Sequence, residues 1–573
     1  MVIMWKPVQL QGWGEGSTHI DAIKTPPEKL QVWRDHLEAL ITSNQVSLLP
    51  GQEAGFGGIE PDALFNEEGA GVLVLARSSG PNRFSLGRNR GALIDGFTIS
   101  GADTGGGIVV NGYAKYLEVS NNRITNNTGF YGGGIRSGHT VVMQEVGVRV
   151  RPTDSQNDYL KLHHNQVVEN GGLDIAGGGI TIGKGTDNYQ VTSNFVCGNF
   201  TSGHGAGIAH YGRSNNGLIA DNTVIFNENF NQQITVNGAG ILVAGAAPEG
   251  CAAGDQACER DRYRSLTEGS GSVSILRNLI KGNSSGAGDG AGIRTSRVNG
   301  QDMLRSNTTY RPESQWNHID ITNNVIVNNV SALSGAGISL QDALRATIVN
   351  NTIANNDNAS VAKETFTPGV PSQSNPQAGA GVVSRAHSLE LQNFLPAGEP
   401  AFSDPVLSDN IIWQNRMFYW MIANDGSKSG LCPDISGNVG LACTGGNAEV
   451  YSDLAVIGTA GNLTCSNCLQ TGGADPQFVS EYVNGNRDTT IFLPETTTAI
   501  TAPPAMDEGG NFIRLRYGPL TQTLSDGVTL RGDYHIQSNS PAVDGSTSAT
   551  PDDIDGDLRP QGSTNDIGAD EYL

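Results

Sequence analysis

A short glycine-rich phrase returns eight times along this chain, each time as Gly-Gly/Ala-Gly followed by a branched aliphatic residue. Fixed phrases that recur every few tens of residues are typical of stacked repeat architectures, because each repeat needs a neighbour to bury its apolar face. The shortest interval, from Ile108 to Ile135, is 27 residues. The aliphatic residue of the phrase is Ile108, Ile135, Ile180, Ile208, Ile241, Ile293, Ile338 or Val382.

A second phrase, Asn-x-Ile/Val-x-x-Asn, follows each glycine phrase. Another aliphatic residue always stands three residues before its first asparagine. We therefore predict three short strands in each repeat, which stack on their copies about 4.8 Å away as in a parallel β-helix. The asparagine pairs are Asn122 and Asn127, Asn165 and Asn170, Asn194 and Asn199, Asn222 and Asn227, Asn278 and Asn283, Asn324 and Asn329, Asn351 and Asn356, and Asn410 and Asn415.

The recurrent asparagines and glycines have structural explanations. Asparagine tolerates the left-handed backbone conformation that a corner requires, and stacked side-chain amides can bond to one another as a ladder. Glycine permits a sharp corner because it has no side chain. We therefore expect these residues to serve the fold. The stretch GADTGGG at 101–107 has no helix after it and so is not a dinucleotide-binding fingerprint.

Two repeats, GGGIVVNGYAKYLEVSNNRITNN and GAGISLQDALRATIVNNTIANND, resemble right-handed parallel β-helix proteins of the pectate-lyase-like superfamily. The ending SPAVDGSTSATPDDIDGDLRPQGSTNDIGADEYL is similar to the closing rungs of bacterial secreted or surface β-helix proteins. The resemblance covers nearly the whole chain. It implies an all-β fold, a single right-handed parallel β-helix solenoid with three strands per rung. It says little about activity, since the superfamily includes lyases, hydrolases, adhesins and structural shafts.

The chain divides into three predicted regions. Residues 1–104 form N-terminal rungs with one short inserted helix near 27–42, where apolar residues recur at helical spacing. Residues 105–416 form an eight-rung core, and residues 417–573 form irregular C-terminal rungs and a closing segment.

Four long insertions interrupt the repeats, near 139–158, 246–271, 296–315 and 384–404. All four leave the repeat at the same point, between the glycine phrase and the asparagine phrase. We therefore expect long loops on one face of the stack, which in repeat proteins is often the binding face. A further insertion, at 357–378, leaves from a different corner.

Charge and hydropathy exclude some partners. The net charge is −22, and an acidic surface repels phosphate backbones, so we expect no nucleic-acid partner. No run of about 18 apolar residues exists, so we expect no membrane span. The start, MVIMWKPVQL, reads as a strand without the pattern of a signal peptide, which predicts a mature form or a fragment of a longer precursor.

Six of the seven cysteines lie in three close pairs. Local disulfides are therefore predicted, and they favour an oxidising location, secreted or at the cell surface. Cys197 stands alone and is expected to be a buried free thiol. The predicted pairs are Cys251 with Cys258, Cys432 with Cys443, and Cys465 with Cys468.

The insertions would wall a groove over the strand that follows each glycine phrase. Basic and aromatic side chains there are candidates for binding a polyanionic sugar chain, since guanidinium groups pair with carboxylates and tyrosine rings stack on sugars. A β-elimination lyase would need such a base and cation, whereas a hydrolase would need a carboxylate pair that we do not find. The candidates are Arg136, Lys184, His210, Tyr211, Arg213, Arg294, Arg385 and His387.

A calcium site is a further prediction, and otherwise no cofactor is expected. The stretch DDIDGDLRP places four carboxylates around Gly556, and closely spaced oxygens at a glycine turn can hold Ca²⁺. The same stretch can also be a plain turn with a salt bridge to Arg559. The candidate ligands are Asp552, Asp553, Asp555 and Asp557.

Together these observations favour a secreted or surface β-helix protein with a structural or attachment role, for which glycan binding and end-to-end self-association are candidate activities. The alternative function is a polysaccharide lyase or glycoside hydrolase that acts in the groove walled by the insertions.

Overall fold

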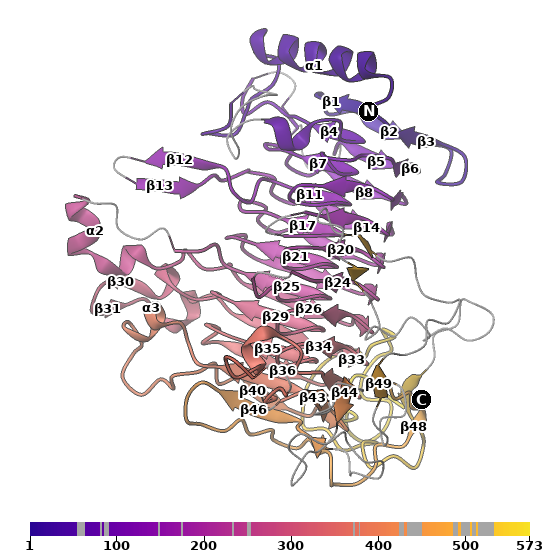
Figure 1. The fold of residues 1–573 in the computed structure, drawn as a ribbon, viewed down its shortest axis with the longest axis vertical. Helices are drawn as coiled ribbons and strands as arrows, with labels where there is room; N and C mark the ends of the chain where they lie inside the picture. The colour runs from indigo at the N-terminus through magenta and orange to yellow at the C-terminus, as the bar shows by residue number, and fades with distance from the viewer. Residues whose placement is uncertain are drawn as a thin grey trace.

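In this computed structural model, most of the described β-strands lie parallel to one another in stacked sheets. The structure describes residues 1–53, 64–80, 83–84, 91–146, 149–173, 176–231, 234–248, 254–370, 373–377, 379–422, 429–432, 450–484, 491–493, 505–506, 512–513 and 532–572. The sheets run along the long axis of the molecule, one strand stacked on the next (Figure 1). This arrangement is consistent with a parallel β-helix.

Four sheets, which we name A to D in chain order, carry the repeats. Sheet A holds β1 (Val2–Met4), β4 (Val72–Val74), β7 (Ile108–Val110), β11 (Ile135–Ser137), β17 (Ile180–Ile182), β21 (Ile208–Tyr211), β25 (Ile241–Ala244), β29 (Ile293–Ser296), β35 (Ile338–Leu340), β39 (Val382–Arg385) and β46 (Leu454–Ile457). Sheet B holds β2 (Gln9–Gln11), β5 (Leu93–Asp95), β8 (Glu118–Ser120), β14 (Lys161–His163), β18 (Gln190–Thr192), β22 (Gly217–Ala220), β26 (Val273–Leu276), β32 (Ile319–Thr322), β36 (Ala346–Val349) and β40 (Val406–Ser408).

Sheet C is as long as sheet A, whereas sheet D is built from two-residue strands. Sheet C holds β3 (His19–Asp21), β6 (Thr98–Ser100), β9 (Arg123–Thr125), β15 (Gln166–Val168), β19 (Phe195–Cys197), β23 (Thr223–Ile225), β27 (Leu279–Lys281), β33 (Val325–Val327), β37 (Thr352–Ala354), β41 (Ile411–Trp413) and β47 (Leu469–Gln470). Sheet D holds β10 (Thr128–Gly129), β16 (Gly171–Gly172), β20 (Phe200–Thr201), β24 (Glu228–Asn229), β28 (Ser284–Ser285), β34 (Val330–Ser331), β38 (Asp357–Asn358), β42 (Arg416–Met417) and β45 (Val450–Tyr451).

Sheets A, B and C correspond to the three strands that the repeat predicts, and sheet D adds a fourth short strand to most repeats. The sequence did not show this strand because two residues between an asparagine and a glycine phrase are too few to show alternation. Pairing is parallel throughout sheets A, B and C. In sheet D only the last pair, β42 with β45, is antiparallel.

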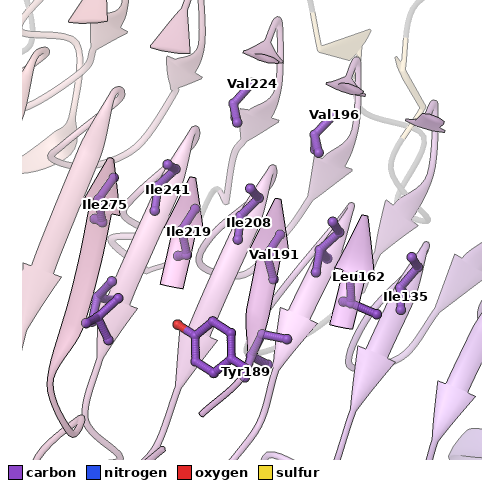
Figure 2. Close-up of a cluster of buried hydrophobic side chains, with 14 of the residues drawn as sticks. Ile135, Leu162, Tyr189, Val191, Val196, Ile208, Ile219, Val224, Ile241 and Ile275 are labelled. Carbon is purple, nitrogen blue, oxygen red and sulfur yellow. The ribbon is translucent and has the colours of Figure 1, made fainter. Parts of the chain in front are cut away.

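The repeated aliphatic residues superimpose as predicted. In sheet A, Ile241 pairs with Ile293, and Ile293 pairs with Ile338. Their side chains point into the space between the sheets and are fully buried in one continuous apolar core. Figure 2 shows this core, with Ile208 and Ile241 of sheet A facing the aliphatic side chains of sheets B and C.

Both asparagine columns form ladders. The Asn278 amide nitrogen donates to the Asn324 side-chain oxygen at 2.9 Å, and the Asn222 amide nitrogen donates to Asn278 in the same way. Each ladder oxygen also accepts the main-chain N–H of the preceding asparagine, as from Asn222 to Asn278 at 3.0 Å. The second column ends at Asp453, whose carboxylate accepts from Asn415. The ladders therefore satisfy buried polar groups at two corners of every repeat.

The left-handed backbone conformation lies one residue earlier than expected. The residue before each ladder asparagine has a positive φ, for example 54° at Asn121 and 58° at Phe226, and the ladder asparagines do not. Because a corner forces this conformation on residues as different as Arg277 and His164, the ladder asparagine is selected for its amide bonds and not for its backbone freedom.

The last glycine of the glycine phrase is needed for close approach between repeats. A Cβ on Gly207 would lie 2.5 Å from the carbonyl oxygen of Gly240 and 3.0 Å from the amide nitrogen of Asn227. Any side chain there would therefore clash with the next repeat, which explains why the phrase keeps glycine at this position.

Helix α1 (Pro27–Thr42) covers the outer face of the first strands of sheet A, within the range that the sequence predicts for a helix. Its buried face, Trp33, Leu37 and Leu40, packs on Leu73 and Val109, which point outward from β4 and β7. A 3-10 turn, η1 (Leu64–Glu67), lies beside it. Among the described residues, no helix is long and apolar enough to cross a bilayer.

The long insertions project on the same side of the molecule (Figure 1). They contain the hairpin β12 (Met143–Val146) and β13 (Arg149–Pro152), α2 (Gln256–Arg260), η2 (Arg262–Ser265), η3 (Gln301–Met303), the hairpin β30 (Leu304–Ser306) and β31 (Thr309–Tyr310), η4 (Glu313–Gln315) and α3 (Leu389–Gln392). The insertion at 357–378 carries η5 (Lys363–Thr365).

Described strands outside sheets A to D and the insertion hairpins come from the C-terminal part of the chain, and their pairing is antiparallel. They are β43 (Tyr419–Ile422), β44 (Ser429–Cys432) and β49 (Ile491–Leu493); β48 (Phe478–Ser480) and β52 (Asp533–Ile536); and β50 (Ala505–Met506) and β51 (Phe512–Ile513). The segment 533–572 packs on the outer face of sheet C, where Tyr534, Ile536 and Ile567 contact residues such as Val327 and Trp413. This segment therefore lies along the side of the stack.

Candidate functional site

Side chains of sheet A alternate between the core and the outer face. In β21, Ile208 is part of the apolar core, whereas Ala209 and Tyr211 belong to a cluster on the outside with Leu242 and Ala244 of β25. The same alternation divides the eight predicted sugar-binding residues, and it removes some of them from any surface.

His210 is the clearest correction, because it points into the core. Its Nε2 donates to the carbonyl oxygens of Gly212 and Ser270, both at 2.8 Å, and its Nδ1 accepts from the Tyr189 hydroxyl at 2.8 Å. Burial lowers the pKa of His210 to about 4. His210 is thus a neutral, satisfied core histidine and does not face a ligand.

We expect His210 to make the protein less stable in acid. The pKa of His210 is about 4 in the folded protein and near 6.5 in the unfolded chain. As the pH falls, the unfolded state therefore binds a proton at a higher pH than the folded state does. The free energy of unfolding decreases as the pH drops from about 6.5 through about 4. The variant His210→Gln should flatten the fall of the urea midpoint between pH 7 and about pH 4.5. As a control, Tyr189→Phe keeps the imidazole and should keep the slope. An unchanged slope in His210→Gln would refute this assignment.

Arg136 is also removed from the predicted groove. It lies on the outer side of β11, but η1 covers it, and its side chain is 1% exposed. Its guanidinium contacts the Glu67 carboxylate, which is itself fully buried, and His139 lies 3.4 Å from the same carboxylate. Burial raises the pKa of Glu67, and Arg136 opposes that rise. The pair attaches η1 to sheet A.

Lys184 and His387 have structural partners as well. The Lys184 ammonium donates to Glu268 at 2.5 Å and to the carbonyl of Pro152 at 2.9 Å, so it ties two insertions together. His387 is buried, with Nδ1 3.5 Å from Asp342. Neither side chain is available to a sugar in this structure.

Arg294 and Arg385 share a buried carboxylate. The Arg385 guanidinium is 3.0 Å from Asp289, and that of Arg294 is 3.7 Å from it. Arg294 also donates to Ser339 at 2.6 Å and to Gln341 at 2.7 Å. Burial lowers the pKa of Arg294 to about 10, so it still carries its charge at neutral pH. These contacts fix the guanidinium of Arg294 on the outer face of sheet A.

A pocket of about 480 Å³ lies on this face, and we name it the sheet-A pocket. Outward residues of β21, β25 and β29, with the residue that follows β35, form its floor. Residues 202–204, together with Asn231, Ile234, Thr235 and Asn237, complete its wall. The floor residues are Tyr211, Leu242, Ala244, Arg294, Ser296 and Gln341.

The sheet-A pocket contains a guanidinium for which the described part of the chain offers no partner. Arg297 lines the pocket, and its side chain makes no ion pair or hydrogen bond with any residue that the structure describes. His204 lies near Arg294 and Arg297, and burial together with these two charges lowers its pKa to about 4. Asp342 is the one carboxylate among the described lining residues. The pocket therefore has a positive electrostatic character within an acidic protein.

A second pocket, of about 460 Å³, lies among the insertions, and we name it the insertion pocket. Arg213 lines it together with Arg151, Arg264, Arg311 and the aromatic ring of Trp316. Arg213 is exposed and pairs with no described carboxylate, so this predicted residue remains available to a ligand. The insertions thus enclose this pocket. They also supply Ser296, Arg297 and Ser388 to the sheet-A pocket, whose other wall comes from residues outside the four predicted insertions.

The predicted calcium ligands do not converge. Asp552 pairs with Arg277 at 3.0 Å, and Asp555 contacts His535 at 2.8 Å. Asp553 accepts the main-chain N–H groups of Asp555 and Asp557 at 2.9 and 2.8 Å, which closes the turn around Gly556. The stretch therefore forms a hydrogen-bonded turn in this structure.

The cysteines are described in part. Cys465 and Cys468 form a disulfide with a Cα–Cα distance of 5.7 Å. Cys258 is disulfide-bonded too. The expected partners Cys251 and Cys443 lie outside the described residues, so the pairing of Cys432 stays a prediction. Cys197 is a free thiol, and burial raises its pKa to about 11.

The sequence interpretation missed Arg297 and His204 as pocket residues. His204 stands directly before the glycine phrase of its repeat, and Arg297 falls just beyond the strand that follows the glycine phrase. Successive side chains of a strand point to opposite faces. If each repeated aliphatic residue points inward, Arg294, one residue after it, points outward, and His210, two residues after it, points inward. No sequence signal marks Asn231, Ile234 and Thr235 as wall residues, because they belong to neither repeated phrase.

The class that fold and site define is therefore an all-β protein of stacked parallel sheets with asparagine ladders and a cationic pocket on one sheet. No family model, no curated protein and no solved structure matches the chain.

Proposed function

We propose that this protein is an extracellular right-handed parallel β-helix, of the pectate-lyase-like and bacterial type, that attaches to an acidic polysaccharide through the sheet-A pocket. The guanidinium of Arg297, which pairs with none of the residues that the structure describes, carries the proposal. A free cation beside a fixed one, Arg294, matches a carboxylate-bearing sugar, because guanidinium groups bind carboxylates by paired hydrogen bonds. The disulfide Cys465–Cys468 supports an oxidising location, secreted or at the cell surface.

The charge balance around the pocket supports an anionic ligand. Arg294, Arg297 and Arg385 contribute three positive charges, and Asp289 and Asp342 contribute two negative charges. His204 stays neutral at pH 7 because its pKa is near 4. One positive charge is therefore left uncompensated beside the apolar floor of Leu242 and Ala244, which suits the carbon face of a sugar ring.

The arrangement favours binding over turnover. A β-elimination base needs a free lone pair, but the Nδ1 of His204 accepts the main-chain N–H of Asn237 at 3.0 Å, which places the proton of the neutral ring on Nε2. A hydrolase needs two carboxylates, and Asp342 already accepts the N–H of Ser388 at 2.7 Å. Lyase or hydrolase activity is the second candidate function, and release of unsaturated or reducing ends from an acidic polysaccharide would favour it.

We expect Arg297→Ala to weaken binding of acidic oligosaccharides by at least about tenfold, since a hydrogen bond to a charged group contributes about 1.5–3 kcal/mol. Calorimetric titration of uronate oligosaccharides and of neutral oligosaccharides measures this. The thermal midpoint should not change, because Arg297 has no described partner.

Arg305→Ala is the matched control, since Arg305 is an exposed arginine that lines neither pocket. Equal affinity of Arg297→Ala and wild type for every acidic oligosaccharide would contradict the proposal. A loss confined to neutral sugars would contradict the proposed ligand class. End-to-end association of copies stays a prediction.

A further inference from the structure

A histidine and three carboxylates meet on the C-terminal segment that lies along sheet C. His535 of β52 has its Nε2 2.8 Å from Asp555 Oδ2, and its Nδ1 contacts Asp533. One ligand atom each of His535, Asp555 and Asp570 lie within 4.8 Å of one another. Asp570 is buried and is held in place by the N–H of Ile536, which donates to one of its oxygens at 2.7 Å.

The cluster carries more negative charge than its surroundings compensate. Three carboxylates surround one imidazole, so the group stays anionic even when His535 is protonated. Two arginines that contact the C-terminal segment have other partners. Arg277 pairs with Asp221 and Asp552. Arg559 donates to the carbonyl oxygens of Asp566 and Gly568, both at 2.9 Å. A cation is therefore the expected occupant.

We propose that His535 Nε2, Asp555 and Asp570 bind a divalent transition-metal ion of the zinc class. One imidazole nitrogen and two carboxylate oxygens form a donor set that Zn²⁺ prefers, with a fourth position left for water. On binding, the imidazole releases the Nε2 proton to solvent. Asp533 accepts from Nδ1 and acts as a positioning residue, as carboxylates do behind metal-bound histidines.

The donor set argues against calcium at the same place. Ca²⁺ takes six to eight oxygens and has little use for an imidazole nitrogen. The carboxylates that the sequence favoured for calcium are otherwise engaged, Asp552 by Arg277 and Asp553 by main-chain N–H groups. The proposed site thus shares only Asp555 with the calcium prediction.

The ion would connect three stretches that are distant in sequence. His535 lies in β52, Asp555 in the turn around Gly556, and Asp570 next to Ala569, which packs on sheet C. A ligand that binds only the folded state raises the midpoint of unfolding. Zinc should therefore fasten this segment to the side of the stack, independently of any sugar in the sheet-A pocket.

The test uses the full chain after removal of metal with a chelator, titrated with zinc chloride by calorimetry. We expect one zinc per chain and a higher thermal midpoint with zinc. Cobalt chloride should give the visible absorption of a four-coordinate Co²⁺ site. His535→Gln and Asp570→Asn should abolish binding. Asp533→Asn should keep the stoichiometry and weaken the affinity by about 10–100-fold.

Asp557→Asn is the matched control, because Asp557 stands in the same turn and its carboxylate lies outside the cluster. Circular dichroism establishes that each variant is folded. The proposal is overturned if wild type binds zinc no better than folded His535→Gln, or if Asp557→Asn loses zinc equally. Binding of calcium chloride without zinc binding would overturn the proposed metal class.

Discussion

Replacement of Arg136 by alanine should lower the free energy of unfolding by about 3–5 kcal/mol at pH 7, because it leaves the Glu67 carboxylate buried without its cation. Both side chains are almost fully excluded from solvent. This decrease in the free energy of unfolding should be smaller at acidic pH. Burial already holds the pKa of Glu67 above its ordinary value, and removal of Arg136 raises it further, so the carboxylate protonates as the pH falls and its charge disappears. Urea titrations at neutral and acidic pH measure both effects.

The matched control for this pair is the double variant Arg136→Met with Glu67→Leu. Replacement of a buried ion pair by apolar residues of similar volume is often neutral or stabilising, so the double variant should recover most of the loss. The sequence placed Arg136 among the sugar-binding residues. If Arg136→Ala abolished binding of acidic oligosaccharides and left stability unchanged, the earlier assignment would be right and the structural one wrong.

Removal of one ladder amide should have the second largest effect. Asn278→Ala deletes donor bonds to Asn324 and to the carbonyl oxygens of Ile219 and Leu276. It also leaves the main-chain N–H of Asn222 without its acceptor in a dry corner. A buried donor without a partner costs about 1–3 kcal/mol, and the lost bonds add to this. We expect the free energy of unfolding to fall by about 3 kcal/mol.

Two comparison variants identify the cause of that loss. Asn375→Ala removes one exposed amide bond, to Thr367 at 3.1 Å, and should change stability by less than about 0.5 kcal/mol. Asn278→Asp keeps the acceptor for Asn222 but loses the donors, so it should be nearly as damaging as alanine. A carboxylate suits only the end of a ladder, as at Asp453, where no further donation is needed. Similar stability of Asn278→Ala and Asn375→Ala would show that the ladder contributes little.

The stack of parallel sheets could be predicted because its information is local and repeated. Ile241, Ile293 and Ile338 each follow the same phrase, and their pairing in sheet A needs only the assumption that equal phrases lie above one another. The ladder from Asn222 through Asn278 to Asn324 follows from the same assumption. The short strands of sheet D carried no such phrase, so the sequence alone did not reveal them.

The candidate site could be predicted only in part. Tyr211 and Arg294 line the sheet-A pocket and Arg213 lines the insertion pocket, as outward residues near the glycine phrase. His210 and Tyr211 are adjacent in β21, and adjacent side chains of a strand point to opposite faces of the sheet. His210 therefore lies in the core and Tyr211 on the outer face. Arg297 and His204 acquire a role only because segments from different repeats meet around them.

The sequence by itself therefore determined the stack of parallel sheets, since the same aliphatic and asparagine positions recur in every repeat. These positions specify which side chains face the core and which amides form the ladders. The tertiary structure alone decided which charges are free. Arg136 pairs with Glu67, which is 69 residues away, and Arg385 pairs with Asp289, which is 96 residues away. Neither carboxylate belongs to the glycine phrase or the asparagine phrase. A guanidinium binds a ligand only when no such partner reaches it, and the approach of non-repeating segments depends on how the whole chain packs.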